Sequence, residues 1–377
     1  MATRLPSSPP ILPGLTYIRP LGSGGFADVF LYEQDMPRRD VAVKVLPSDV
    51  RDPELRRMFN AEADVLAHLS AHPSIVTVYQ AGISADGRPY IVMEFCPGGF
   101  ALRYRRERVP VPEVLEIGVR MASALESAHR AGLVHRDVKP SNILVTTFGA
   151  PVLADFGISS SLSRATADEV LAMSIPWSAP EVVAEQTAGT VASEVWSLGA
   201  TVYSLLAGHS PFERRERGQN TKEQLRRRIA RASYTPISRT DVPDSLQEVL
   251  ARAMTRDPAR RYASAREFAE ALRAVQSELG ISPTALEVPV DEWSAASAPV
   301  DFADSTMRGV ARSHITRDER RKTRPGAGVA ELARDEDTDI SVSSSPRRRV
   351  LPWVVAGIAA LVALAAIGVA LLASGVL

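Results

Sequence analysis

The sequence predicts an α+β fold with a β-rich first part and a mostly helical second part, followed by a disordered linker and one apolar helix. Three observations support this prediction. Residues 14–34 alternate apolar and polar side chains around a glycine-rich turn, and the β-branched run "VAVKVL" follows. From residue 53 onward, apolar residues recur at helical spacing. Residues 350–377 carry no charge.

The overall composition argues against a nucleic-acid partner. Lys and Arg number 44, as do Asp and Glu, so no net charge attracts nucleic acid. The basic runs also lack the interleaved aromatic residues of a nucleic-acid surface. The single cysteine rules out an internal disulfide and indicates a reducing compartment.

The chain of 377 residues, long enough for more than one domain, divides by composition into four parts. Residues 1–13 form a Pro-rich tail without the apolar run of a secretory signal. Residues 14–279 keep the pattern of one folded domain. Residues 280–349 are rich in Ser, Arg, Asp and Ala, which predicts a disordered linker. Residues 350–377 complete the chain.

Residues 350–377 predict a transmembrane helix, because about 20 apolar residues suffice to cross a bilayer. Arg347, Arg348 and Arg349 precede the segment, and Trp353 lies where an interfacial aromatic residue would. We therefore expect a single-pass protein of the cell membrane, with the folded domain in the cytoplasm and a short C-terminus outside. The alternative is a buried core helix, but no neighbouring element could cover it all round.

A helix is predicted from about Pro53 to Ala71, where Pro73 closes it. Glu62 falls on the apolar stripe of this helix, which is formed by Leu55, Phe59, Leu66 and Leu69. An acid on a buried face needs a cation, and Lys44 in the preceding strand is the best candidate. The alternative is that Glu62 lies at the edge of the stripe and reaches solvent.

The stretch "GSGGFADVF", residues 22–30, almost matches G-x-G-x-x-G-x-V. Glycines let backbone N–H groups approach phosphate oxygens closely. Ala27 stands where the pattern has its third glycine, and glycine-rich hairpins without a ligand are common. A dinucleotide-binding fold would need a helix directly after the glycines, whereas a strand pattern follows here.

The stretch "VHRDVKPSNILV", residues 134–145, places several charges inside an apolar run, which is costly unless each has a partner or a task. Together with the glycine-rich loop, "VAVK", the helix bearing Glu62, "DFG" and "SAPE", it occurs in the order of a known family. Residues 14–279 resemble a eukaryotic-like Ser/Thr protein kinase of the bacterial receptor-kinase type. The resemblance implies the bilobal protein kinase fold.

The resemblance also implies phosphoryl transfer from ATP with Mg²⁺, for which Mn²⁺ can substitute, to Ser or Thr hydroxyls of proteins. Asp137 would orient the substrate hydroxyl or accept its proton, and Lys139 would neutralise the moving phosphoryl group. Asn142 and Asp155 would hold the metal. His135 would be structural.

By the same resemblance, Lys44 paired with Glu62 would contact the α- and β-phosphates. The adenine would lie between Val29 and Ala42 on one side and Leu144 on the other. The predicted ATP-binding residues are Leu21, Gly22, Ser23, Gly24, Gly25, Val29, Ala42, Lys44, Glu62, Met93, Glu94, Cys96 and Leu144. Cys96 is either a small hydrophobic residue or a target for covalent labelling.

Residues 155–181 would be the activation segment. Thr166 and then Ser163 are the candidate autophosphorylation sites, since a phosphate there could pair with Arg136. Unmodified hydroxyls are the alternative. Ser174 would contact the catalytic Asp and Lys.

The chain departs from the family pattern at Ala27, at Trp177, where Tyr is typical, and at Glu194, where an Asp anchors the backbone of the catalytic loop. Because Glu194 keeps a carboxylate, we expect function to survive. Arg261 is expected to form a buried pair with Glu181.

Two rival functions fit parts of this pattern. A pseudokinase scaffold usually lacks one of the residues that stand here as Lys44, Asp137, Asn142 and Asp155. A small-molecule phosphotransferase would need neither "SAPE" nor Lys139. Expected partners are protein substrates, the membrane, a second copy through small residues of the apolar helix, and phosphothreonine-binding proteins that would dock on Thr306, Thr316, Thr323 and Thr338.

Overall fold

The computed structural model describes residues 6–24, 27–46, 53–156, 174–214, 216 and 218–288. None of their helices is long and apolar enough to cross a membrane. The predicted transmembrane helix, residues 350–377, and the linker from residue 289 onward lie outside them.

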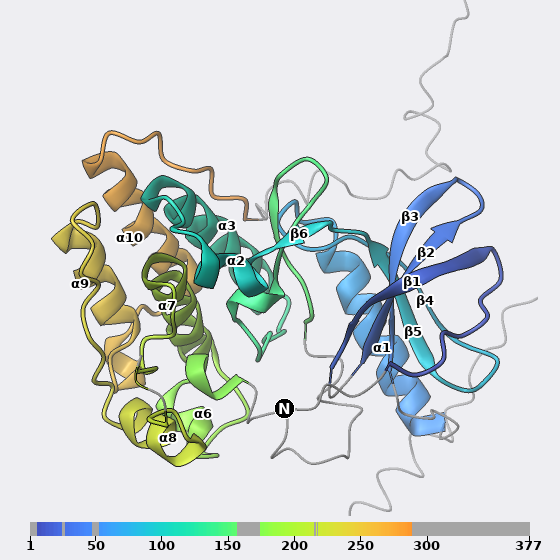
Figure 1. Cartoon of the computed structure of the whole chain (residues 1–377), viewed down its shortest axis with the longest axis horizontal. Coiled ribbons are helices and arrows are strands. Elements are labelled where there is room, and N and C mark those ends of the chain that lie inside the picture. The colour runs from blue at the N-terminus through green and yellow to red at the C-terminus, as the bar shows by residue number, and fades with distance from the viewer. Residues whose placement is uncertain are drawn as a thin grey trace, which may run out of the picture. The chain divides into compact units, whose positions relative to one another are not determined.

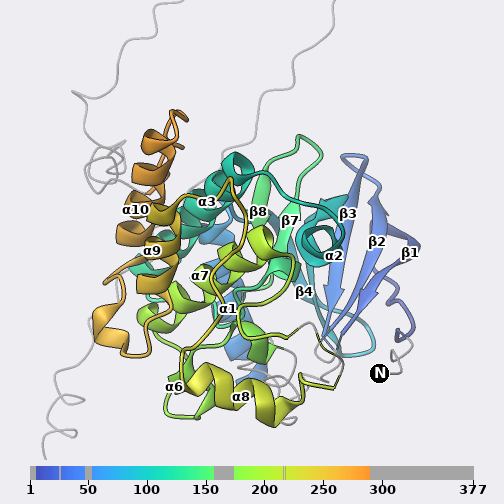
Figure 2. The same cartoon turned by 60° about the vertical axis from the view of Figure 1, so that its left-hand side comes forward.

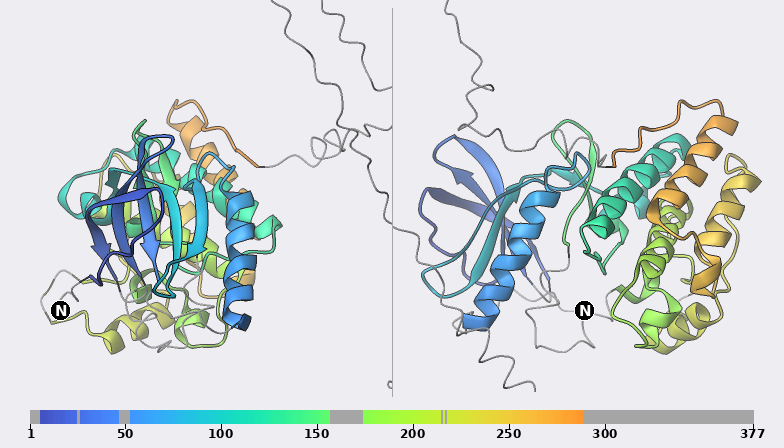
Figure 3. Two further views of the ribbon diagram at one scale, coloured as in Figure 1. Left: turned by 90° about the vertical axis from the view of Figure 1, so that its right-hand side faces the viewer. Right: turned by 180° about the vertical axis from the view of Figure 1, so that it is seen from behind.

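The N-terminal part of the domain is a five-stranded antiparallel sheet in the order β1-β2-β3-β5-β4 (Figure 1). Its strands are β1 (Leu15–Ser23), β2 (Asp28–Gln34), β3 (Arg39–Val45), β4 (Val78–Ile83) and β5 (Pro89–Glu94). Helix α1 (Pro53–Leu69) lies against one face of this sheet, as Figure 3 shows, with Phe59 and Leu66 in the same apolar cluster as Ile91. The predicted helix and strands are therefore present, which confirms the β-rich first part.

The opposite face of the sheet is covered by the N-terminal segment. Leu12 is buried there among Phe30, Tyr32 and Val43. The Tyr32 hydroxyl donates a hydrogen bond of 2.7 Å to the carbonyl oxygen of Pro10. Part of the predicted Pro-rich tail thus packs on the domain, because its prolines and Leu12 close an otherwise exposed apolar face.

The C-terminal part is mostly helical, as predicted (Figure 2). Its α-helices are α2 (Phe100–Arg106), α3 (Val111–Arg130), α6 (Pro180–Val183), α7 (Val191–Ala207), α8 (Lys222–Ala230), α9 (Asp244–Ala253) and α10 (Ala265–Glu278). Short 3-10 turns are η1 (Pro140–Asn142), η2 (Ile175–Trp177) and η3 (Pro258–Arg260). Helix α7 forms the centre: Trp196 and Val202 are fully buried, a capping box at Thr190 starts the helix, and Gly208 ends it in the left-handed conformation.

A small sheet places the end of the catalytic loop beside the "DFG" segment. Its strands, in the order β6-β7-β8, are β6 (Gly98–Gly99), β7 (Ile143–Val145) and β8 (Pro151–Leu153). Ile143 pairs with Leu153, and the Ala154 N–H donates to the Asn142 carbonyl over 2.9 Å. These backbone bonds bring Asn142 next to Asp155, although 12 residues separate Asn142 from Ala154.

Residues 280–288 follow α10 and pack on the folded domain, although composition placed the start of the linker at residue 280. Gln276 and Thr284 exchange two hydrogen bonds of 2.8 and 2.9 Å. Glu287 reaches the loop between α1 and β4, where its carbonyl lies 2.6 Å from His72 Nε2. The Ser74 N–H donates to His72 Nδ1, so Nε2 carries the proton and donates to Glu287. Hydrogen bonds of both backbone and side-chain groups, in addition to apolar side chains, therefore hold this segment.

Candidate active site

The buried carboxylate of Glu194 holds the backbone of the catalytic loop. Glu194 on α7 accepts the backbone N–H of Arg136 at 2.5 Å through one oxygen and lies 2.6 Å from His129 Nε2 through the other. The Glu194 and His129 side chains are 2% and 6% exposed. Arg136 itself has a φ of 69°, a strained conformation for a residue with a side chain. The longer side chain at position 194 therefore still anchors this loop, as expected.

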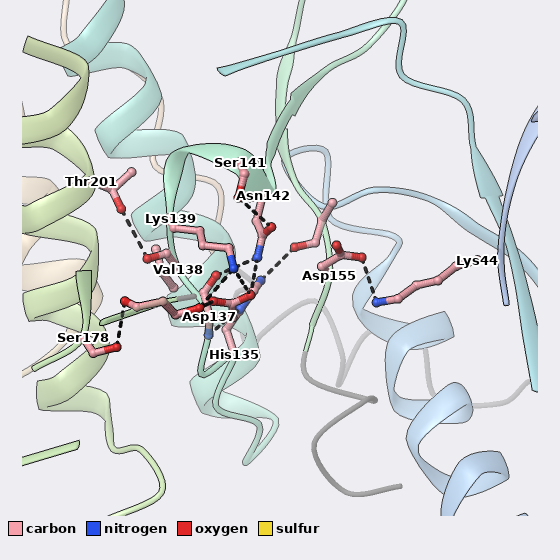
Figure 4. Close-up of polar contacts among 12 residues, drawn as sticks. Lys44, His135, Asp137, Val138, Lys139, Ser141, Asn142, Asp155, Ser178 and Thr201 are labelled. Atoms are coloured by element: carbon pink, nitrogen blue, oxygen red, sulfur yellow. Dashed lines mark hydrogen bonds and ion pairs between the residues drawn. The ribbon is translucent and has the colours of Figure 1, made fainter. Parts of the chain in front are cut away.

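The structure brings Asp137, Lys139 and Asn142 together (Figure 4), and Ser174 contacts both Asp137 and Lys139. Lys139 Nζ lies 2.8 Å from Asp137 Oδ2. Ser174 Oγ donates to Asp137 Oδ1 at 2.5 Å and accepts from Lys139 Nζ at 3.1 Å. The predicted contact of Ser174 with both residues is confirmed. A hydroxyl can therefore reach Asp137 Oδ1 with a cation beside it.

His135 is a structural residue. It is fully buried, and its ring lies 4.5 Å from that of Phe156. The Asp137 N–H points at His135 Nδ1 over 3.3 Å, so the proton is on Nε2, which donates to the Ala154 carbonyl over 3.0 Å. The ring thus ties the catalytic loop to the segment that carries Asp155.

Lys44 on β3 pairs with Asp155, whose Oδ1 lies 2.9 Å from Lys44 Nζ. The Lys44 ammonium holds the pKa of the Asp155 carboxyl below its usual value, so this carboxylate is ionised at neutral pH. Asp155 has a φ of 64°, another left-handed residue at the site. Glu62 is part of α1, but its side chain lies outside the described residues, and so does its predicted pair with Lys44.

The donor set suits a divalent cation that also binds phosphates. Asn142 donates from Nδ2 to the Asp137 carbonyl at 2.7 Å, which leaves its Oδ1 as an oxygen ligand; there it accepts a long bond of 3.4 Å from Ser141. Asp155 supplies a carboxylate that is 42% exposed. In the described part of the chain, no group of three or more His, Cys, Asp or Glu residues could hold a metal unaided. Two oxygen donors fit a metal that keeps substrate phosphates in its shell.

The predicted adenine-facing residues Val29, Ala42 and Met93 lie on one face of the five-stranded sheet, and Leu144 lies on β7 of the small sheet. Val29 pairs with Lys44, and Ala42 pairs with Met93, which places these four side chains on the same side. Met93, Cys96 and Leu144 pack on one apolar cluster formed by Val76, Val152 and Ala154. A cavity is lined by Lys44, Leu66, Ile75, Met93, Asp155 and Phe156, among others. The site therefore has an apolar wall that ends in a Lys–Asp pair.

Burial raises the pKa of the Cys96 thiol to about 12, and the neighbouring Glu94 adds to this effect. Since the thiolate is the nucleophile, this environment disfavours the covalent labelling suggested by its position.

The glycine-rich loop begins at the end of β1, which contains Leu21, Gly22 and Ser23. The Gly24 N–H then donates a hydrogen bond of 3.0 Å to the Ala27 carbonyl and closes the hairpin. Gly25 lies outside the described residues.

The candidate phosphosites Thr166 and Ser163 also lie outside the described residues. After this gap, the Trp177 indole N–H donates to Ser204 on α7 at 3.0 Å. Arg261 forms the predicted pair with Glu181, with bonds of 2.6 and 2.8 Å. The Arg261 side chain is fully buried, so this pair fixes the end of the activation segment to the core.

Three residues that hold the loops of the site were not predicted from the sequence: His129, Ser7 and Asp28. His129 was not singled out, although its place at the end of the α3 pattern is compatible with an inward-facing ring. Ser7 in the N-terminal tail donates two hydrogen bonds to Asp28 at the start of β2. This contact was also missed, because nothing in a Pro-rich tail shows which strand it contacts.

Comparisons with known proteins agree with this geometry. The protein kinase domain family matches residues 15–273. Serine/threonine-protein kinase PknK of Mycobacterium bovis is 41% identical over 281 residues, covering 74% of this chain and 25% of PknK. PknL of Mycobacterium tuberculosis is 32% identical over 371 residues, covering 92% of this chain and 91% of PknL. The crystal structure of a point mutant of the Mycobacterium tuberculosis PknI kinase domain superposes with a TM-score of 0.53 at 32% identity, covering 72% of this chain and 99% of that domain.

The fold and the site define a protein kinase, and this chain belongs to the protein kinase family. Its relatives place it more narrowly among the bacterial serine/threonine-protein kinases. The chain spans about a quarter of the length of PknK, so the similarity to PknK concerns the kinase domain. Membership of the family implies the use of ATP and a divalent metal.

Proposed function

We propose that this protein is a Ser/Thr protein kinase that transfers the γ-phosphoryl group of ATP to Ser or Thr hydroxyls of proteins. The observation that carries the proposal is the contact of the Ser174 hydroxyl with Asp137 and Lys139. It supports the view that a hydroxyl can be oriented by a carboxylate while an ammonium group stands beside it.

In the proposed reaction, the substrate oxygen forms a bond to the γ-phosphorus, and the bond from this phosphorus to the β–γ bridging oxygen breaks. Asp137 orients the hydroxyl and takes its proton, and ADP leaves. Lys139 offsets the negative charge of the moving group. Mg²⁺, or Mn²⁺ in its place, would be held by Asn142 and Asp155 and would neutralise phosphate charge.

The proposal is tested with the full-length protein, γ-labelled ATP and Mg²⁺, with Asp155→Asn as the matched control. We expect label on Ser or Thr in the wild type alone. Wild-type protein that binds nucleotide but incorporates no label would identify a pseudokinase scaffold instead. Label that depends on added small molecules, with none on protein, would favour the phosphotransferase alternative.

Autophosphorylation of Thr166, and then of Ser163, is part of the proposal. The hydroxyl-rich sequence of this segment and the position of Arg136 beside Asp137 support it. Mass-spectrometric mapping of the same samples tests it. Absence of phosphate between residues 155 and 181 in active protein would overturn this part alone.

We further propose that residues 350–377 tether the kinase domain to the cell membrane, with the domain on the cytoplasmic side. The uncharged length of this segment and the three arginines before it support the proposal. Membrane fractionation with and without the segment tests it. Three kinds of partner are also proposed from the sequence. They are protein substrates, phosphothreonine-binding proteins that dock on the linker threonines, and a second copy of this chain that binds through the apolar helix.

A further inference from the structure

The N-terminal residues Ser7–Leu12, here called the N-terminal strap, connect two separated parts of the β-sheet. One end contacts Asp28, the last residue of the glycine-rich loop and the first of β2. The other end inserts Leu12 into the outer apolar face of the sheet. The strap contacts Asp28, Arg88 and Tyr32, all of which lie outside the catalytic loop.

Asp28 joins the strap to the glycine-rich loop through its two carboxylate oxygens. Ser7 donates to Oδ2 from both its backbone N–H, at 2.9 Å, and its hydroxyl, at 2.6 Å. Ser23, inside the loop, donates its hydroxyl to Oδ1 at 2.6 Å. Asp28 is 2% exposed. Since a buried carboxylate needs such donors, Ser7 and Ser23 are tied to each other through it.

Arg88, in the turn before β5, holds the strap from the other side. Its guanidinium donates to the Ser7 hydroxyl and to the Ser8 carbonyl, both at 2.9 Å. Asp86 orients the guanidinium by accepting from Nε at 2.8 Å. The Ser7 hydroxyl therefore lies between a cation and a carboxylate, accepting from the first and donating to the second.

A third contact fixes the middle of the strap. The Tyr32 hydroxyl donates to the Pro10 carbonyl at 2.7 Å, and burial raises the pKa of Tyr32 to about 12, so the hydroxyl keeps its proton. Prolines at positions 9 and 10 restrict the backbone around this contact. The strap is thus held at three points along the sheet.

We propose that Ser7 and Asp28 are positioning residues for nucleotide binding: the N-terminal strap holds the Ser23 side of the glycine-rich loop in the conformation that receives the ATP phosphates. The proposal rests on the proposed function of this loop. A loop that is already ordered loses less conformational freedom when its ligand binds, so the strap favours affinity for ATP without taking part in the chemistry.

The test uses full-length protein with Ser7→Ala and Asp28→Asn. Ser8→Ala is the matched control, because Ser8 is exposed and its printed contact with Arg88 uses the backbone carbonyl. Ser7→Thr keeps the hydroxyl and should restore the wild-type behaviour. We expect Mg·ATP to bind about three- to tenfold more weakly to the first two variants, an effect the size of one ordinary hydrogen bond. The KM for ATP should rise while kcat and the KM for protein substrate change less than about twofold.

Amide hydrogen exchange of residues 21–28 in nucleotide-free protein is the second readout. We expect faster exchange in Ser7→Ala and Asp28→Asn than in Ser8→Ala. Equal exchange and equal ATP affinity in all variants, with ATP bound normally by the wild type, would overturn the role of the strap alone. Wild-type protein that does not bind Mg·ATP would overturn the proposed function and this inference together.

Discussion

The catalytic loop, residues 135–142, and the glycine-rich loop, residues 21–28, would act on the same nucleotide but are held in different ways. The catalytic loop rests on buried groups from three elements: Glu194 on α7, His129 on α3 and the Ala154 carbonyl after β8. The glycine-rich loop has its own hairpin bonds and one buried carboxylate, Asp28, which a segment from the start of the chain helps to satisfy.

This difference predicts which property each region controls. Contacts of the catalytic loop lie in the main core of the domain, so breaking them should affect both chemistry and folding stability. Contacts of the glycine-rich loop lie at the end of the sheet, so breaking them should affect nucleotide affinity while the domain stays folded.

The largest effect is expected from Asp137→Asn. This change removes the group that takes the proton of the substrate hydroxyl, and it should lower kcat by about 10²–10⁴-fold. The KM for ATP should change little, because Asp137 faces the hydroxyl and not the adenine. Steady-state kinetics on a protein substrate measures both. A rise in the KM for ATP with unchanged kcat would contradict the assigned role.

Glu194→Ala should have the second-largest effect. It removes the carboxylate that accepts the Arg136 N–H and contacts the buried His129 ring, and each lost contact costs about 1–3 kcal/mol of folding free energy. The midpoint of thermal denaturation and kcat should therefore fall together. Glu194→Asp, the residue typical of the family, keeps a carboxylate and should lose less of both. An alanine variant as stable and active as the wild type would show that the loop does not depend on this anchor.

A smaller effect is expected from Arg88→Ala, which removes the hydrogen bonds that the guanidinium donates to Ser7 and Ser8 of the N-terminal strap. We expect Mg·ATP to bind about threefold more weakly, with kcat and thermal stability close to the wild type. Arg38→Ala is the control, because Arg38 is a surface arginine with a side chain 77% exposed. Calorimetric titration measures the affinity of each variant for Mg·ATP. Equal affinities of the two variants would show that Arg88 does not help to hold the strap.

The last prediction concerns the chemical reactivity of the Cys96 thiol. At pH 8 its thiolate fraction should be about a thousandfold below that of a cysteine with a pKa of 9.0, since the folded pKa is about 12. Alkylation by a maleimide should be slow in folded protein and should speed up about tenfold per pH unit below that pKa. Protein unfolded in urea, the control, should react quickly. Rapid labelling of the folded form at pH 8 would contradict the burial of this thiol.

The sequence was most informative where function depends on local order. Asp137, Lys139 and Asn142 lie within six residues, so their proximity could be predicted, whereas the contact of Ser174 with Asp137 and Lys139 was predictable only through the resemblance. The Glu181–Arg261 pair spans 80 residues and was predictable only through the resemblance. The contacts of His129, Ser7 and Asp28 were not predicted, because a serine or a histidine gives no sign in the sequence of its distant partner.

Residues 280–288 carry a practical consequence for the design of recombinant fragments. A fragment ending at residue 279 would lack Glu287 and so lose its hydrogen bonds with His72, Ser74 and Ser123. It would also expose apolar surface that Ile281 and Leu286 cover. The useful cloning boundary is thus set by hydrogen bonds about nine residues beyond the point where the amino-acid composition changes, and an expression series should end at residue 288 or later.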